Sequence, residues 1–321
     1  MIQKTIRRSF RLALSLLLVS AAGLTACGET ITPPPGSEEN EQKGETTPAP
    51  LNETVYVDVE TFESLREEGA PIPDVRAEEA YGEGHVPGAV EAPWSALKDD
   101  DREGAFIERD PAKLREKVRQ LGIDEDQKVL VYAGAISTLA ARQAWSLEFA
   151  GLGDVYILNG GYKTWLKEAS VDPSTTAPNI EKGDAEVAVR SSIRATGEDV
   201  QKAVEGERPA ILFDSRSEDE YEGTDERDNP RHGHVPNAIH YNWKNVFTEA
   251  GKLRPKSELR AELEEKGLLK ENSVIIPYCQ GGFRSAVVYS VLRWLGHDDA
   301  QNYDGSWWEW SRNNNVDVET K

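Results

Sequence analysis

The chain has 321 residues, which is long enough for two domains of ordinary size with room for further segments. It carries 37 Lys and Arg residues against 57 Asp and Glu residues, so its formal net charge is −20. This acidic balance argues against a nucleic-acid-binding protein, because contacts to phosphate need a basic face. The two cysteines, Cys27 and Cys279, exclude a disulfide framework.

The first 26 residues have the pattern of a secretory signal peptide. An uncharged stretch rich in Leu and Ala, residues 12–26, is too short for a transmembrane helix, which needs about 20 residues. It follows four basic side chains, Lys4, Arg7, Arg8 and Arg11.

The end of this stretch, Leu24-Thr25-Ala26-Cys27, resembles the bacterial lipobox. In that class of signals the cysteine is lipidated and becomes the first residue. The resemblance implies export to the bacterial cell envelope, with the membrane contacted only through a lipid at Cys27. The alternatives are an uncleaved short anchor and an ordinary signal peptide with an unrelated cysteine.

Residues 27–53 are rich in Pro, Glu, Thr and Gly and show no apolar periodicity. They include Pro33-Pro34-Pro35 and Pro48-Ala49-Pro50. This composition predicts a disordered, semi-extended stalk between the membrane and the folded part.

The remainder contains one unit twice, because four short motifs recur in the same order. The pairs are Asp74-Val75-Arg76 with Asp214-Ser215-Arg216, Gly84-His85-Val86-Pro87 with Gly233-His234-Val235-Pro236, Val129–Tyr132 with Val274–Tyr278, and Asn159–Trp165 with Asp304–Trp310. We therefore expect two homologous domains, residues 54–170 and 190–321. They are joined by a linker, residues 171–189, that contains Pro173, Pro178 and Gly183.

Each copy alternates short apolar runs with helical patterns. Residues 129–132 and 274–278 are typical of buried strands, and residues 114–121 and 259–268 of amphipathic helices. Residues 285–295 form a compact apolar stretch that predicts a buried helix, with Gly296 placed to terminate it. This alternation predicts an α/β fold in which a parallel sheet is covered on both faces by helices.

Cys279 lies directly after a predicted strand and before a predicted helix, in Cys279-Gln280-Gly281-Gly282-Phe283-Arg284-Ser285. The carboxyl ends of strands in open α/β sheets are where ligands bind. A turn there can aim backbone N–H groups inward, and the helix N-terminus and Arg284 add positive charge. These features stabilise a thiolate, the form that a reactive cysteine requires. The alternative is a buried, inert thiol.

The motifs Asp214-Ser215-Arg216, Gly233-His234-Val235-Pro236, Cys279–Arg284 and Asp304–Trp310 together resemble the rhodanese family of sulfurtransferases, and in particular its tandem-domain thiosulfate sulfurtransferases. The resemblance spans residues 54–317. It implies a five-stranded parallel sheet in each domain, an inactive first domain and a catalytic second domain. The first copy has Ala133 or Gly134 at the position of Cys279 and therefore lacks the thiol.

The resemblance also implies a mechanism without a cofactor. The Cys279 thiolate takes a sulfur atom from thiosulfate or a related donor, and a thiol or cyanide then accepts it from the Cys279 persulfide. Arg284 is expected to stabilise the anionic donor. The loop residues Gln280, Gly281, Gly282, Phe283 and Ser285 are expected to bind the persulfide through their backbone N–H groups. The related dual-specificity phosphatases have one residue more between Cys and Arg, so we expect sulfur rather than phosphate in this loop.

Several points stay open at the level of sequence. Glu220 stands where vertebrate-type thiosulfate enzymes have an arginine, so we expect a compensating cation from Arg216, Arg231 or Lys244. 3-Mercaptopyruvate is the alternative donor, and an envelope redox protein is an alternative acceptor. A rhodanese module that binds a sulfur species or a protein without turnover is the alternative function. No set of His, Cys and carboxylates has metal-ligand spacing, so we predict no metal site.

Overall fold

The structure is a computed structural model that describes residues 47–135, 137–225 and 227–321. The predicted signal peptide, Cys27 and the predicted stalk up to residue 46 lie outside these residues. Within the described part of the chain, no helix combines the length and the apolar character that crossing a membrane requires.

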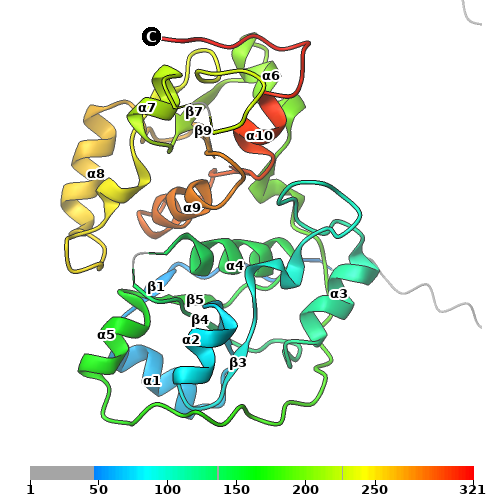
Figure 1. The fold of residues 1–321 in the computed structure, drawn as a ribbon, viewed down its shortest axis with the longest axis vertical. Helices are drawn as coiled ribbons and strands as arrows, with labels where there is room; N and C mark the ends of the chain where they lie inside the picture. The colour runs from blue at the N-terminus through cyan, green and yellow to red at the C-terminus, as the bar shows by residue number, and fades with distance from the viewer. Residues whose placement is uncertain (1–46, 136, 226) are drawn as a thin grey trace, which may run out of the picture. The chain divides into compact units, whose positions relative to one another are not determined.

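The first half alternates strands and helices from residue 56 to residue 168 (Figure 1). Its elements are β1 (Tyr56–Val57), α1 (Val59–Glu67), β2 (Ile72–Asp74), α2 (Glu78–Glu83), β3 (Ala89–Glu91), the 3-10 helix η1 (Trp94–Leu97), α3 (Pro111–Arg119), β4 (Val129–Val131), α4 (Thr138–Phe149), β5 (Val155–Leu158) and α5 (Gly161–Glu168).

The second half repeats this order. Its elements are η2 (Ser191–Ile193), β6 (Arg194–Ala195), α6 (Gly197–Val204), β7 (Ala210–Asp214), α7 (Glu218–Glu222), β8 (Ile239–His240), η3 (Trp243–Val246), α8 (Lys256–Glu265), β9 (Val274–Tyr278), α9 (Arg284–Trp294), β10 (Asn302–Tyr303) and α10 (Ser306–Trp310). The helix predicted over residues 285–295 is α9, and Gly296 follows it with a φ of +83°.

Both halves contain the predicted five-stranded parallel sheet. In the first half, β1 pairs with β5, β5 with β4, and β2 with β3. The parallel bridge between Asp74 and Tyr132 joins β2 to β4 and completes the order β1-β5-β4-β2-β3. In the second half, the bridge between Ile275 and Ala300 joins β9 to β10, which gives the corresponding order β6-β10-β9-β7-β8.

Alternate residues of the central strands face opposite sides of the sheet, as the two-residue period of a strand requires. Leu130 and Tyr132 pack with α1 and α5, whereas Val129 and Val131 pack with α3 and α4. The apolar cluster on the α4 side continues without interruption into α8 and α9 of the second half. The two halves of the molecule therefore share this apolar cluster, and each has a second cluster of its own on the other face of its sheet.

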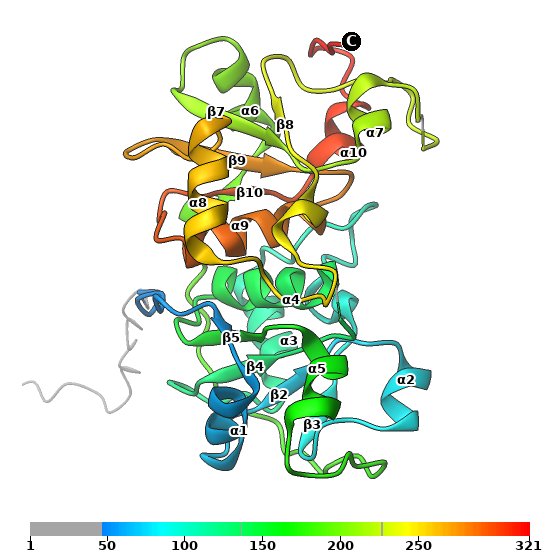
Figure 2. The same ribbon diagram turned by 90° about the vertical axis from the view of Figure 1, so that its left-hand side faces the viewer.

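Helix α4 of the first half lies against α9 of the second half (Figure 2). Residues 140–149 of α4 are all buried, because one face covers its own sheet and the other meets α9. The small side chains of Ala140, Ala141 and Ala144 permit this close packing. A buried ion pair between Glu148 and Arg293 crosses this contact, and Tyr289 donates a 2.8 Å hydrogen bond to Glu148.

The end of the predicted stalk requires a correction. The composition predicts that the stalk extends to residue 53, but the backbone N–H groups of Ala49 and Asn52 donate to the carbonyls of Gly151 and Gly153. Leu51 packs against the apolar core, and the carbonyl of Asn52 accepts from Arg293 at 2.5 Å. An apolar side chain and paired backbone groups hold this segment on the folded unit.

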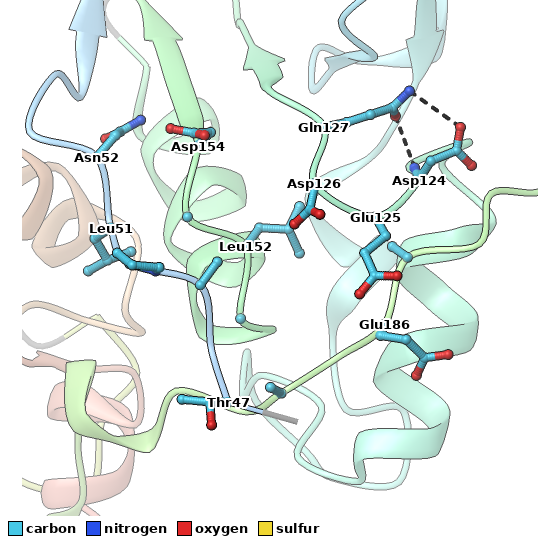
Figure 3. Close-up of a pocket in the computed structure, with 16 residues that line it drawn as sticks. Thr47, Leu51, Asn52, Asp124, Glu125, Asp126, Gln127, Leu152, Asp154 and Glu186 are labelled. Carbon is cyan, nitrogen blue, oxygen red and sulfur yellow. Dashed lines mark hydrogen bonds between the residues drawn. The ribbon is translucent and has the colours of Figure 1, made fainter. Parts of the chain in front are cut away.

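The predicted linker also packs against the first half rather than running free. Ala185 and Val187 are buried, and the N–H groups of Gly183, Ala185 and Ala188 donate to carbonyls of the first half. The linker and residues 47–52 border a cavity of about 720 Å³ beside the segments that precede β4 and β5 (Figure 3).

The buried pair between Glu148 and Arg293 predicts a large effect on stability. Glu148→Ala leaves Arg293 without its carboxylate, and we expect the free energy of unfolding to fall by about 3–5 kcal/mol. Urea denaturation measures it. The matched control is Glu168→Ala, which removes the half-exposed pair with Lys252 and should cost about 0–1 kcal/mol. Equal losses in the two variants would contradict the role of the buried pair.

Candidate active site

Cys279 directly follows β9, the central strand of the second sheet, and precedes α9. All strands of this sheet are parallel, so the residues that follow β7 and β9 meet at one edge. Cys279 is 1% exposed and is a free thiol. The sequence prediction of a cysteine at a strand–helix junction is confirmed.

The loop surrounds the sulfur atom with hydrogen-bond donors. The hydroxyl of Ser285 donates to Sγ at 3.6 Å, and the backbone N–H groups of Ser285 and Gly281 also point at the sulfur. Gly282 has a φ of +83°, and its N–H donates to the hydroxyl of Ser306, which itself lies 4.0 Å from Sγ.

Ser306, the first residue of α10, stabilises the cysteine loop through hydrogen bonds. Its hydroxyl accepts hydrogen bonds from the N–H groups of Cys279 and Gly282, each at 3.0 Å, and donates to the carbonyl of Tyr303 at 2.7 Å. Ser306 has a φ of +50°, a conformation that favours glycine. The corresponding residue of the first half is Gly161, with a φ of +61°. The second half thus accepts backbone strain at a residue whose hydroxyl the cysteine loop uses.

The hydrogen bonds that follow these two residues align the two halves. The backbone N–H of Tyr162 donates to the carbonyl of Ala133 at 2.8 Å, and the backbone N–H of Trp307 donates to the carbonyl of Cys279 at 2.9 Å. Ala133 is therefore the structural counterpart of Cys279, which decides between the two positions that the sequence left open. A methyl group stands where the second half has its thiol.

Arg284 and Glu220 form a buried bidentate ion pair beside the cysteine. The two terminal nitrogens of Arg284 donate to Glu220 at 2.6 and 2.8 Å. Burial opposes the charge of Glu220. Burial therefore raises its pKa, but the charge and hydrogen bonds of Arg284 and the N–H and hydroxyl of Ser217 lower it by more. The resulting pKa of Glu220 is about 2. Glu220 is therefore an anion at neutral pH and holds the fork of Arg284 in place.

The pKa of Cys279 is shifted below the ordinary value of a thiol. Burial raises this pKa, but the charge of Arg284 and the donors from Ser285 and Gly281 lower it by more. Glu220 occupies both terminal nitrogens of Arg284, so Arg284 acts on the sulfur through its charge. The arrangement favours a thiolate in a place almost closed to water.

The first half supplies one wall of the loop. The ring of Trp94 meets Phe283 edge to face at 5.0 Å, and Phe106 meets Trp308 in the same way at 5.8 Å. The methyl group of Ala105 lies close to Gly281. On the other side, the amide of Gln280 donates to Asn229 at 2.8 Å. Aromatic side chains from both halves thus enclose the cysteine loop.

The structure does not support Arg216 or Arg231 as the compensating cation for an anionic donor. Arg216 is buried, and its guanidinium donates to Asp214 and to the carbonyl of Gly233. The guanidinium of Arg231 donates to carbonyls of the C-terminal segment: Trp310, Ser311, Asn313 and Val316. These donors are used in holding the fold. Lys244 is exposed on η3, and its backbone N–H and carbonyl take part in the caps of this helix, with Asn242 and Phe247.

Metal binding and the cavity of Figure 3 are two further properties of the described residues. No group of three or more His, Cys, Asp and Glu side chains in the described ranges is arranged to hold a metal ion. The cavity of Figure 3 is bordered by acidic side chains, Asp124, Glu125, Asp126, Asp154 and Glu186. Because like charges repel, this cavity does not suit an anionic sulfur donor.

Replacement of Ser306 tests its support of the loop. Ser306→Ala leaves the buried N–H groups of Cys279 and Gly282 without their acceptor, and we expect a loss of about 1–3 kcal/mol in the free energy of unfolding. The control is Ser311→Ala, since the Ser311 hydroxyl is buried without a hydrogen-bond partner among the described residues. A loss in Ser306→Ala no larger than in the control would contradict this role.

Comparison with known proteins agrees with this geometry. The rhodanese-like domain family matches residues 58–168 and again residues 196–313. A thiosulfate sulfurtransferase of Corynebacterium glutamicum is 32% identical over 250 residues, which cover 75% of this chain and 81% of the relative. The sulfur carrier protein TtuD of Thermus thermophilus is 36% identical, covering 72% and 83%.

A solved structure extends the comparison to three dimensions. The crystal structure of SseA from Escherichia coli, described with the rhodanese fold and mechanism of 3-mercaptopyruvate sulfurtransferases, matches with a TM-score of 0.71 and 27% identity. The match covers 79% of this chain and 99% of that one. Two matching halves, a cysteine loop in the second and curated relatives along most of the chain show that this protein belongs to the rhodanese family.

Proposed function

We propose that this protein is a thiosulfate sulfurtransferase that moves sulfane sulfur through a persulfide on Cys279. The observation that carries the proposal is the buried free thiol, whose pKa is lowered by Arg284 and by donors of the loop. The curated relatives of similar length that are named thiosulfate sulfurtransferases support the same reaction.

In the first step the Cys279 thiolate attacks the outer sulfur of thiosulfate. A new S–S bond forms to Cys279, the S–S bond within thiosulfate breaks, and sulfite leaves with that electron pair. The negative charge moves to the outer sulfur of the persulfide. Donors from Gly281 and Ser285, together with the charge of Arg284, stabilise the anion before and after transfer.

In the second step a nucleophilic acceptor attacks the outer sulfur of the persulfide. With cyanide, a C–S bond forms, the persulfide S–S bond breaks, and thiocyanate leaves while Cys279 returns to a thiolate. A thiol acceptor gives a new persulfide by the same displacement. An envelope redox protein that presents such a thiol is the protein acceptor that fits the proposed location.

Thiosulfate is the donor that the relatives favour. The Corynebacterium glutamicum relative named a thiosulfate sulfurtransferase is 32% identical to this chain, whereas the structure described for 3-mercaptopyruvate sulfurtransferases is 27% identical. Another relative, the sulfur carrier protein TtuD, is named for carrying sulfur. A persulfide on Cys279 can pass its outer sulfur to a protein or to a small acceptor.

The test of the proposed function is thiocyanate formation from thiosulfate and cyanide by the full chain. A Cys27→Ser background leaves Cys279 as the only thiol. We expect activity in this background, and a fall of several orders of magnitude to the uncatalysed level after Cys279→Ser, because no other side chain in the loop supplies a sulfur nucleophile.

Undiminished activity in Cys279→Ser would refute the assigned nucleophile. Activity with 3-mercaptopyruvate and none with thiosulfate would refute the donor. A reduced, folded protein that is inactive with both would favour the binding module over the enzyme.

We further propose that the chain is exported and anchored in the bacterial cell envelope by a lipid on Cys27. The basic residues before residue 12, the uncharged stretch and the lipobox-like Leu24–Cys27 support this location. Two lipid chains or more give stable anchoring without a membrane-spanning helix.

Cys27→Ser tests the anchor in cells. We expect the variant to lose incorporated fatty-acid label and to leave the membrane fraction, because the substituted residue has no thiol to lipidate. Retention of label and of membrane association by Cys27→Ser would contradict lipidation at this residue.

A further inference from the structure

Arg142 is a buried side chain of the first half that reaches the cysteine loop of the second. It lies in α4 and is 3% exposed. One terminal nitrogen donates to the carbonyl of Ala105 at 2.5 Å, and the other reaches the carbonyl of Gly282 at 3.5 Å. The guanidinium lies 5.4 Å from the ring centre of Phe283. One side chain thus connects the wall of the first half to the loop that carries Cys279.

The fit between Arg142 and the loop is close. A Cβ atom added at Gly282 would lie 2.6 Å from a terminal nitrogen of Arg142 and 2.8 Å from the Cα atom of Asp304. No side chain fits there without moving one of these neighbours. Arg142 therefore packs directly on the loop backbone three residues after the nucleophilic cysteine.

Arg142 has no carboxylate within 4.0 Å among the described residues, although a buried cation without a counter-charge is costly. The nearby Asp304 is already paired with Arg194 at 2.8 Å and accepts from the N–H of Ile107. Burial lowers the pKa of Arg142 to about 10, and the negative charges of Asp304 and Cys279 oppose this shift.

Among the described residues, the charged groups around the loop balance when the sulfur is ionised. Apart from Arg216, the buried and nearly buried guanidinium groups described there are three, Arg142, Arg194 and Arg284, and the described buried carboxylates that face them are two, Glu220 and Asp304. The neighbouring Arg216 is neutralised by its own partner, Asp214. Arg227, half exposed at the outer side of Glu220, is screened by water. A thiolate or persulfide on Cys279 supplies the missing negative charge.

We propose that Arg142 is a positioning residue for sulfur transfer, which packs on the backbone of Gly282 and supplies the buried positive charge that a thiolate or persulfide on Cys279 neutralises. This inference rests on the proposed function for its meaning in catalysis. It assigns the half without a thiol a direct electrostatic part in the chemistry of the other half.

The experiment is a pH titration of the Cys279 thiolate by its ultraviolet absorbance, in the full chain with Cys27→Ser. The signal of the same protein with Cys279→Ser is subtracted to remove tyrosine. Arg142→Met and Arg142→Gln remove the charge with different packing, and Arg142→Lys retains it. The matched control is Arg190→Gln, since Arg190 also donates to backbone carbonyls, those of Glu148 and Gly151, away from the loop.

We expect the titration midpoint to rise by about one pH unit in the Met and Gln variants, a tenfold change in the ratio of thiolate to thiol. Arg142→Lys should keep the midpoint close to that of the parent protein, because the charge is retained. Arg190→Gln should leave the midpoint unchanged. A midpoint unchanged in a folded Met or Gln variant, or raised equally in the Lys variant, would overturn the proposal. So would an equal shift in Arg190→Gln, because it would show a general response to destabilisation.

This readout separates the proposal from the proposed function, since the titration needs no donor and no turnover. A shifted midpoint in a protein that transfers no sulfur would support the role of Arg142 and refute the enzyme. Normal sulfur transfer with an unshifted midpoint would support the enzyme and refute the role of Arg142.

Discussion

The central constraint on the site is to favour a thiolate in a place nearly closed to water. Cys279 is 1% exposed, and burial alone would favour the neutral thiol. The loop meets this cost with donors from Gly281 and Ser285 and with the charge of Arg284. The fold must therefore hold these groups around one sulfur atom. All of them come from the second half, and the first half contributes aromatic side chains that cover the loop.

The duplicated fold separates what serves the scaffold from what serves the chemistry. Asp74, Arg76 and Tyr132 in the first half make the same hydrogen bonds as Asp214, Arg216 and Tyr278 in the second. A network present with and without the thiol belongs to the fold. The differences lie at Ala133 against Cys279 and at Gly161 against Ser306, where the second half gains a thiol and the hydroxyl that supports it.

The fold and the reactive cysteine follow from local patterns in the sequence. The repeated motifs predict two domains, and the strand, two glycines and arginine around Cys279 predict its position. The roles of the charged residues could not be predicted, because they depend on contacts between distant segments. From the sequence alone, the carboxylate of Glu220 is expected to lower the affinity for an anionic donor. In the structure it is the counter-ion that fixes Arg284 beside the sulfur.

Ser306 and Arg142 were missed for different reasons. Ser306 had a signal in the sequence, because it replaces the Gly161 of the first copy at a position where glycine fits best. Arg142 had none, since its burial follows from the packing of α4 on α9 and not from its neighbours in the chain. Arg216 and Arg231 were proposed as substrate contacts because they are cations near the motif, but the fold uses their donors internally.

Sulfur transfer in this loop requires that Cys279 carries the sulfur covalently. The most direct measurement is the intact mass of the full-length Cys27→Ser protein after incubation with thiosulfate and no acceptor, followed by peptide mapping. We expect a mass increase of one sulfur atom, located on the peptide that contains Cys279 and removed by cyanide. A folded, reduced protein that gains no sulfur, or gains it on another residue, would refute a persulfide on Cys279.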